Sequence, residues 1–400
     1  MLMRKSTRKI LFYFFASAFL VSAPLVVLST AGFRISLNNQ RIQQTGALAV
    51  STSPRGASVS VDGAVVSGKT PTVVQRISPN DVKVSLEKKG YIHFEETVHV
   101  NAGETTYITT LLYADEASET FLDLPQTFSV AESQDGRYIG SLSESKGKLQ
   151  ISLYDVAARF NRTFTVIPVV EKNAYTLSWL KNSVLALKEN GTPVRAFTAN
   201  GEELTGAALQ GALANNAERI TLKDNGSNIE VRSGSADGKL IGLLPLGTYT
   251  VLETDDDYAL VKDSRDTLYL ISLTSSLVTA MNGKGVLYDW LSSEHTLVWS
   301  DGLEVNMYNA DKKEKTFVTR QSDPITALLW HPSGMAIILG GEKKITAIDT
   351  ENTSTFRETP LVTDAPGSIS RVWLDDSGKN LFYLQKSGED ATLERRRLVK

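Results

Sequence analysis

Cysteine is absent from the 400-residue chain, and so is any strong excess of charge of one sign. The lack of cysteine excludes disulfides, thiolate metal sites and a cysteine nucleophile, as well as the lipid-carrying cysteine of a bacterial lipoprotein. A formal net charge of −3 gives no sign of the clustered basic face that nucleic-acid binding usually needs. With 42% hydrophobic and 22% charged residues, the chain can nevertheless bury a core. We therefore expect a folded protein that has no nucleic acid as a partner.

Familiar catalytic and metal-binding motifs are also missing. The four histidines are His93, His99, His295 and His331. None belongs to an H-E-x-x-H motif, and residues 234–238 (GSADG) carry alanine where the nucleophile of a G-x-S-x-G motif would stand. The acidic runs Asp255–Asp257 and Asp375–Asp376 lack EF-hand spacing and are typical of turns, where Asp is favoured. We expect no cofactor and no metal, and we assign no catalytic or cofactor-binding residue.

The amino-terminal segment joins a basic cluster to an apolar run. The basic residues are Arg4, Lys5, Arg8 and Lys9. No side chain from Ile10 to Phe33 is charged, and the run reaches the roughly 20 residues that a membrane-spanning helix needs. Because the positive charges precede it, the run predicts a single-pass anchor in the cytoplasmic membrane, with the amino terminus inside and the later residues outside. A cleaved signal peptide is the alternative, with a small-residue cleavage site at Ser29–Ala31.

Residues 51–71 (STSPRGASVSVDGAVVSGKTP) contain the letters of both a P-loop and a β-hairpin. Gly63 and residues 68–70 (GKT) complete the pattern G-x-x-x-x-G-K-[ST]. A P-loop opens a helix, whose amino-terminal N–H groups meet the phosphate. Here Pro71 and a β-branched run follow, which is a poor start for a helix. We therefore predict a hairpin that turns at Asp62–Gly63 and binds no nucleotide.

Apolar residues alternate with polar ones from residue 46 onward, in about six short runs separated by turn residues, which predicts an all-β unit. The motifs SPRGASVSVDG, GKTP, VKVSLEKKGY and TTYITTLLY follow one another in this unit. They resemble the PEGA domain over residues 46–113, although the Pro-Glu-Gly-Ala signature of that family reads PRGA at Pro54–Ala57. The resemblance implies a small β-sandwich of the kind common on prokaryotic surface proteins.

The rest of the chain repeats one pattern, in which a short strand, a polar turn and a second apolar strand follow one another. The repeats align on Val130, Trp179, Ile220, Val251, Trp290, Trp330 and Trp373. Their spacings are 49, 41, 31, 39, 40 and 43 residues, and four-stranded propeller blades take about 40–45 residues each. We expect the repeated tryptophans to pack in the core between blades rather than to serve as ligand platforms.

The turns HPSG, DDSG and SQDG of these units resemble those of TolB-like or WD40-like propeller repeats, although no Trp-Asp pair ends the third strand. This resemblance implies a propeller of about seven blades. Residues 208–218 are expected to form a loop between blades. The sequence leaves open whether residues 120–125 (TFLDLP) close the ring by pairing with the last blade.

Together these features predict an all-β protein with an amino-terminal transmembrane helix, a PEGA-like β-sandwich and a β-propeller of about seven blades. The expected divisions are a cytoplasmic basic tail (1–9), a transmembrane anchor (10–33), a stalk (34–45), the PEGA-like sandwich (46–113), a linker (114–125) and the propeller (126–400).

The expected function is that of a membrane-anchored, extracytoplasmic binding or scaffold protein of the cell envelope, which acts through its propeller surface and is not an enzyme. Its expected contacts are an envelope protein or glycan, and the membrane through the amino-terminal helix. The alternative is an envelope polysaccharide hydrolase that uses carboxylates of the propeller channel. That alternative needs carboxylates about 5–9.5 Å apart in a concave pocket.

Overall fold

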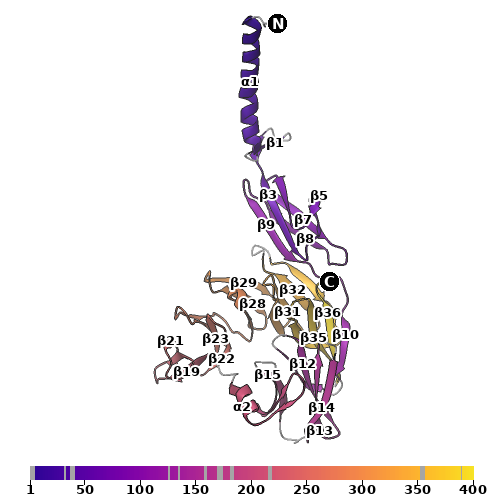
Figure 1. The fold of residues 1–400 in the computed structure, drawn as a ribbon, viewed down its shortest axis with the longest axis vertical. Coiled ribbons are helices and arrows are strands. Elements are labelled where there is room, and N and C mark those ends of the chain that lie inside the picture. The colour runs from indigo at the N-terminus through magenta and orange to yellow at the C-terminus, as the bar shows by residue number, and fades with distance from the viewer. Residues whose placement is uncertain are drawn as a thin grey trace. The chain divides into compact units, whose positions relative to one another are not determined.

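The structure is a computed structural model that describes residues 5–30, 33–36, 41–124, 127–133, 136–156, 160–168, 174–180, 184–214, 219–351, 356–388 and 390–400. The chain divides into two compact units, Met1–Asp115 and Glu116–Lys400, and each is described by itself (Figure 1).

The first unit opens with α1 (Lys5–Thr30), followed by the antiparallel pair β1 (Phe33–Ser36) and β2 (Arg41–Gln44). Among the residues whose placement and side chains the structure describes, no helix combines the length and the apolar character needed to cross a membrane. The prediction of a single-pass membrane protein anchored by residues 10–33 is therefore wrong.

Two sheets that share one core complete the first unit. The strands are β3 (Gly46–Ser53), β4 (Ser58–Val61), β5 (Ala64–Lys69), β6 (Thr72–Ile77), β7 (Asp81–Glu87), β8 (Phe94–His99) and β9 (Thr105–Leu111). The sheet orders are β6-β3-β9 and β5-β4-β7-β8, and β3 runs parallel to β9. Alternation along the strands buries Leu48 of β3 and Val84 of β7 in that core. The predicted β-sandwich is confirmed.

The P-loop-like segment is a hairpin, as predicted. Asp62 and Gly63 have φ values of 48° and 80° and form the tight turn between β4 and β5. No helix follows Thr70, because β6 begins at residue 72. The Thr70 hydroxyl is buried and accepts hydrogen bonds from the backbone N–H of Gly56 (3.1 Å) and Ala57 (3.0 Å). Thr70 therefore links the connection between β5 and β6 to the loop that contains Gly56 and Ala57.

Within its described residues, the second unit contains seven antiparallel sheets, which we number blades 1–7 in chain order. Blade 1 has β11 (Thr127–Glu132), β12 (Tyr138–Ser145), β13 (Lys148–Asp155) and β14 (Phe160–Pro168); blade 2 has β15 (Tyr175–Leu180), β16 (Val184–Glu189), β17 (Thr192–Thr198) and β18 (Glu203–Leu204). Blade 3 has β19 (Ile220–Asp224), β20 (Ile229–Ser233) and β21 (Leu240–Leu244); blade 4 has β22 (Tyr249–Thr254), β23 (Tyr258–Asp263), β24 (Leu268–Ser272) and β25 (Val278–Ala280).

The remaining blades follow the same order. Blade 5 has β26 (Leu287–Leu291), β27 (Thr296–Ser300), β28 (Glu304–Asn309) and β29 (Glu314–Arg320); blade 6 has β30 (Ala327–Trp330), β31 (Ala336–Gly340), β32 (Ile345–Asp349) and β33 (Glu358–Val362). Blade 7 has β34 (Ser368–Leu374), β35 (Asn380–Ser387), β36 (Asp390–Arg397) and β10 (Glu119–Leu124). First strands of several neighbouring blades contact one another: β11 contacts β15, β26 contacts β30, and β30 contacts β34. Four-stranded sheets that follow one another in this way are the blades of a β-propeller.

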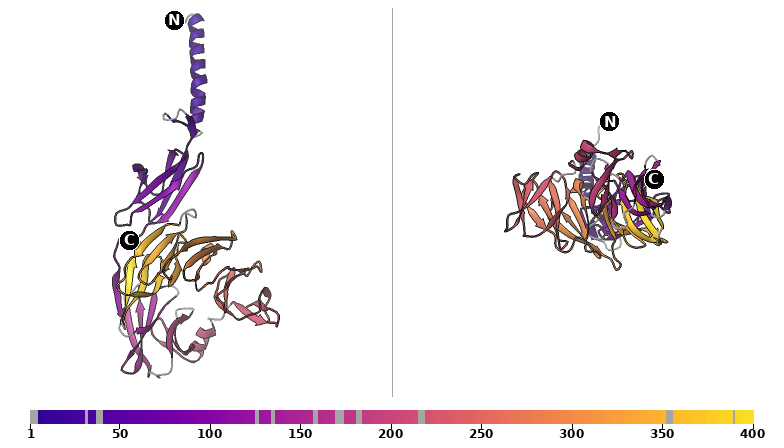
Figure 2. Two further views of the ribbon diagram at one scale, coloured as in Figure 1. Left: turned by 180° about the vertical axis from the view of Figure 1, so that it is seen from behind. Right: turned by 90° about the horizontal axis from the view of Figure 1, so that it is seen from below.

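Strand β10 closes the last blade. It pairs antiparallel with β36, with Leu122 opposite Leu393 and Leu124 opposite Ala391. Leu124, Trp373 and residues of blade 1 share one hydrophobic cluster. The yellow carboxy-terminal strands accordingly lie beside the magenta strands of blade 1 (Figure 2). The open question about residues 120–125 is thus answered for the described strand: the start of the second unit completes its last sheet.

The repeated tryptophans lie between blades, as expected. Trp290 packs in a cluster of blades 4 and 5, and Trp330 in a cluster of blades 5 and 6. Both are 7% exposed, Trp373 is 4% exposed, and Trp179 is partly buried against blade 1. One local prediction was wrong: where a loop was expected over 208–218, α2 (Gly206–Ala214) covers much of the segment, and residues 215–218 lie outside the described ones.

Candidate functional site

The four histidines do not meet in one place. His93 and His99 lie on exposed surface of the sandwich, where the His99 Nδ1 is 2.7 Å from Asp81. His331 is buried in blade 6, and burial lowers its pKa. His295 lies in the connection between β26 and β27 of blade 5. In the part of the chain that the structure describes, no three His, Asp or Glu side chains are arranged to hold a metal ion.

The two acidic runs occupy turns, as predicted. Asp255 follows β22, and its carboxylate accepts hydrogen bonds from the backbone N–H of residues 257 (2.9 Å) and 258 (2.7 Å). Asp375 follows β34 and accepts one from the backbone N–H of Lys379 (2.9 Å). These bonds fix the turn between the first and second strands of a blade.

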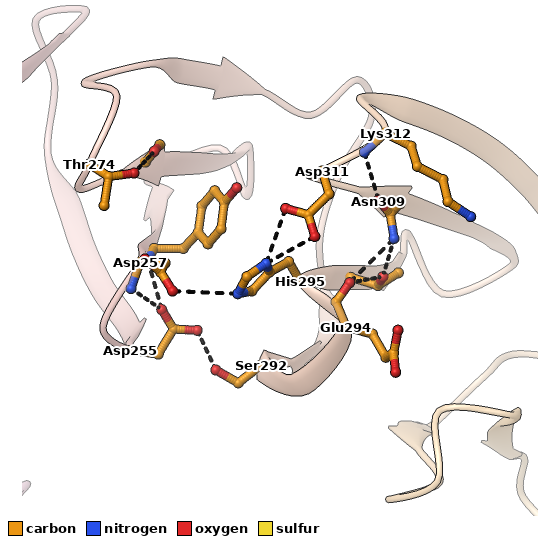
Figure 3. Close-up of polar contacts among 12 residues, drawn as sticks. Asp255, Asp257, Thr274, Ser292, Glu294, His295, Asn309, Asp311 and Lys312 are labelled. Carbon is orange, nitrogen blue, oxygen red and sulfur yellow. Dashed lines mark hydrogen bonds and ion pairs between the residues drawn. The ribbon is translucent and has the colours of Figure 1, made fainter.

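A histidine bridges the ends of blades 4 and 5 (Figure 3). The short helix η2 (Ser292–Glu294) ends at His295, which takes the left-handed conformation (φ 44°, ψ 45°). The His295 Nδ1 lies 3.1 Å from both carboxylate oxygens of Asp311, and its Nε2 lies 3.6 Å from the Asp257 carboxylate. The ring also packs against Tyr258, with 5.0 Å between ring centroids. We call these four residues the His295 cluster.

Next to this cluster, Asp255 ties the same two blades together. Its second carboxylate oxygen accepts hydrogen bonds from the Trp290 indole (2.7 Å) and from the Ser292 hydroxyl. Burial alone would raise the pKa of Asp255, but the hydrogen bonds from Ser292 and Trp290 lower it below its usual value. Since the polar groups here bond to one another, we interpret Asp255 and the His295 cluster as a joint between blades rather than as an open ligand site.

An open site adjoins this joint, between blades 5 and 6. It is a cavity of about 240 Å³, which we call the acidic recess. Its charged lining residues are Glu294, Lys312, Glu314 and Glu351, and its apolar ones are Leu291, Met307 and Trp330. The three glutamates are exposed, and within the described residues none of them forms an ion pair. With three glutamates and one lysine in its lining, the recess therefore has an excess of negative charge.

The framework of the recess is held by hydrogen bonds. The Asn309 amide donates to the Thr296 hydroxyl (2.9 Å) and its oxygen accepts from the backbone N–H of Lys312 (2.8 Å) (Figure 3). Gly334 has φ +75°, and a Cβ there would lie 3.1 Å from the Leu291 side chain and 3.3 Å from the Glu294 Cγ, so a larger residue would crowd this side of the recess. Burial, then Asp349 and Glu294, raise the pKa of Glu351, while Lys312 lowers it.

A second cavity of similar size, about 250 Å³, lies between blades 7 and 1. Its charges are already paired, because Arg395 bonds Glu119 and the Asp155 carboxylate lies 3.1 Å from the Arg137 guanidinium. Of these two cavities, the acidic recess has the larger excess of negative charge among its lining residues. That difference makes the recess the stronger candidate for ligand binding.

Two further carboxylates lie on innermost strands, where the hydrolase alternative would need them. Burial, then Asp289 and Asp255, raise the pKa of Glu253 on β22 to about 7. Burial raises the pKa of Asp289 on β26 to about 6, although it accepts hydrogen bonds from the backbone N–H of Trp290 (3.0 Å) and Trp330 (2.6 Å). The Asp289 carboxylate thus links β26 to β30 through its hydrogen bond from the Trp330 backbone.

The sequence analysis identified none of the carboxylates of the acidic recess, and it placed Trp330, which lines the recess, in the core between blades. The carboxylates come from η2, from β29 and from the turn after β32, so no short motif contains them. The only signal that could have found the site is the repeat itself, because it places the same turn of blades 5 and 6 at the same end of neighbouring sheets.

Comparisons with known proteins support the first unit most directly. The family profile of the PEGA domain matches residues 45–114. No curated protein matches the chain. Among solved structures, a chain of the crystal structure of a mitotic checkpoint complex matches with a TM-score of 0.41 and 11% identity, over 71% of this chain and 90% of the other. The WD40 domain of Neurospora crassa Pan2 matches with a TM-score of 0.40 and 11% identity, over 69% and 92%.

Proposed function

We propose that this protein is a non-enzymatic binding protein whose propeller docks a protein partner at the end of the blades that carries the acidic recess. The observation that carries the proposal is the set of three unpaired carboxylates around one cavity on a hydrogen-bonded framework. Exposed charge of one sign on a rigid concave surface is suited to steering and orienting a partner of opposite charge.

The size of the recess supports a protein partner. At about 240 Å³ it is smaller than the roughly 300–1,000 Å³ of cavities that enclose a whole small molecule. A cavity of that size suits one side chain, which a protein partner can insert while the surrounding blade ends supply the remaining contact area.

Photo-crosslinking tests the proposal in the cells that express the full chain. A benzophenone amino acid replaces Lys312 at the rim of the recess, or Lys343 as the matched control. Both lysines are exposed, and Lys343 lies in the β31–β32 turn, at the opposite end of the strands. We expect protein adducts from position 312 that are absent from position 343. Equal adducts from both positions, or none from position 312, would contradict the proposal.

The hydrolase alternative has one observation in its favour, the pKa of about 7 for Glu253, which is suitable for a general acid. Against it, the neighbouring Asp289 is buried and already accepts two backbone hydrogen bonds. The test is the release of products from end-labelled cello- and chito-oligosaccharides by the full chain and by Glu253→Gln. We expect the wild-type chain to release no more product than the variant does. If the wild type releases product and Glu253→Gln abolishes that release, the hydrolase function is favoured instead.

A further inference from the structure

Blade 3 is one strand short of a complete blade. Within the described residues it has three strands, whereas each of the other six sheets of the propeller has four. Its outermost strand, β21, pairs with β20 on one side (Figure 1). In the part of the chain that the structure describes, no strand pairs with the other side of β21. One row of its backbone N–H and C=O groups is therefore available for pairing.

The outer edge of β21 also lacks the charges and prolines that usually prevent edge strands from pairing. Residues 240–244 read LIGLL. The outermost strands β10, β14, β18, β29 and β33 each carry a charged residue, a proline or both. The outermost strand β25 lacks them as well, but it is only three residues long. Since charge and proline on an edge oppose pairing with another chain, β21 is the described blade edge best suited to such pairing.

Apolar side chains accompany this edge. Ile241 and Leu244 pack in the cluster that blades 3 and 4 share. Leu240 and Leu243 do not belong to that cluster, and they are 44% and 48% exposed. Leu246, two residues after the strand, is 59% exposed. Neighbouring exposed leucines beside an available strand edge are typical of a surface that another protein chain covers.

Blade 7 shows what kind of segment completes a blade in this fold. Its fourth strand, β10, comes from the start of the second unit and pairs antiparallel with β36, near the end of the chain. The fourth strand of a blade therefore need not follow the third strand in sequence. Every strand that the structure describes already belongs to a sheet, so a strand that completes blade 3 would come from another molecule.

A second copy of the chain suits this edge because the edge is self-complementary. Two β21 strands related by a two-fold axis perpendicular to the sheet run antiparallel, and the same surface of each copy meets the other. The segment LIGLL brings no like charges together in this pairing. Each face of the sheet continues from one copy into the other, so the exposed Leu240 and Leu243 of both copies gather on one face and leave water.

We propose that two copies of this chain pair antiparallel through β21, so that the two blades 3 form one continuous sheet. The inference goes beyond the proposed function, because it concerns blade 3, whereas the acidic recess lies between blades 5 and 6. The dimer carries two recesses, which strengthens binding to a partner that has two matching sites.

The expected association is weak. A single strand pair buries less than the roughly 1,600 Å² of a standard interface, so we expect a dissociation constant of about 10–100 µM. At about 1 µM, where tryptophan fluorescence can follow unfolding, the chain is then a monomer by mass action. Sedimentation equilibrium of the full chain from about 1 to 300 µM measures the association over this range. A chain that stays monomeric throughout would overturn the inference.

Matched lysine substitutions test whether β21 is the surface concerned. We expect Leu243→Lys to weaken the dimer by at least about tenfold, because two like charges then meet at the paired edge. Phe317→Lys is the control, since Phe317 is 55% exposed on β29, the outermost strand of the complete blade 5. It should associate like the wild type. Circular dichroism shows whether each variant is folded. Association of Leu243→Lys at the wild-type strength would mean that another surface pairs, and the inference would be wrong.

Spin labels test the pairing of the strands directly. The chain has no cysteine, so Leu240→Cys and Phe317→Cys each introduce one labelling position. Paired strands lie about 4.8 Å apart and rise about 3.3 Å per residue, so labels at position 240 of the two copies should lie within about 30 Å of each other. We expect double electron–electron resonance to give this short distance for position 240 but not for position 317. A dimer without the short distance at position 240 would overturn the inference.

Discussion

At the scale of single residues, Glu253 links the stability of the propeller to pH. Its pKa in the folded chain is about 7, above the ordinary value of 4.5, because burial and the neighbouring acids disfavour its charge. A raised pKa means that the folded state holds this proton more tightly than the unfolded state does. The stabilisation is therefore fully present when the pH is below 4.5, the pKa of this group in the unfolded chain. It is lost as the pH rises from about 4.5 toward 7, the pKa in the folded chain.

Glu253→Gln is expected to stabilise the protein at pH 8, because the neutral amide carries no charge to bury. We expect a gain of roughly 3 kcal/mol at pH 8 and almost none at pH 4, since one pKa unit is worth about 1.4 kcal/mol. Urea unfolding of the variant and the wild type at both pH values measures this difference. The exposed Glu342→Gln should unfold like the wild type at each pH. If the free energy of unfolding of the variant changed with pH as that of the wild type does, Glu253 would not be the group that causes the loss of stability.

At the scale of elements, the strand β10 adds a fourth strand and a buried side chain to blade 7. Leu124 is 2% exposed and packs with Trp373 and Phe382 of blade 7. We expect Leu124→Ala to lower the free energy of unfolding by about 2–5 kcal/mol, the usual range for such a truncation in a core. Leu240 on β21 is 44% exposed, so Leu240→Ala is the control and should change stability by less than about 1 kcal/mol. Equal losses in the two variants would mean that β10 adds no core to the blade.

The elements also show what the sequence can predict and what it cannot. The blades were predictable because a tryptophan recurs at one position, where it packs between sheets. Turn chemistry was equally readable: Gly378, in the DDSG turn, has φ +64°, and a Cβ there would lie 2.4 Å from the His331 ring. The acidic recess was not predictable, because its carboxylates come from η2, from β29 and from the turn after β32, and only the packing of blades 5 and 6 brings them to one cavity.

The amino-terminal helix illustrates the opposite error. An uncharged run behind a basic cluster predicts an anchor on composition and position alone. The helix is present over Lys5–Thr30, but no helix among the described residues has the length and apolar character needed to cross a membrane. Helix α2 was missed for a related reason, since a run of small residues between blades has no periodic apolar face to mark it. Local composition predicts an element less reliably than a repeated pattern does.

At the scale of the whole molecule, the two units have separate cores. The core of the sandwich is built from β3 to β9 and adjoining residues, and the clusters of the propeller are built from residues of its own blades. All five tryptophans lie in the second unit. Their fluorescence therefore reports on the propeller alone, whereas far-ultraviolet circular dichroism reports on the strands of both units.

Leu86→Ala should consequently separate the unfolding of the two units. Leu86 is fully buried in the sandwich, and its truncation is expected to destabilise that unit by about 2–5 kcal/mol. In urea, part of the circular dichroism change should move to lower denaturant concentration, while the midpoint followed by tryptophan fluorescence stays where it is in the wild type. If the fluorescence midpoint moves by the same amount, the two units unfold as one cooperative block, and their separate cores are coupled through the segment that joins them.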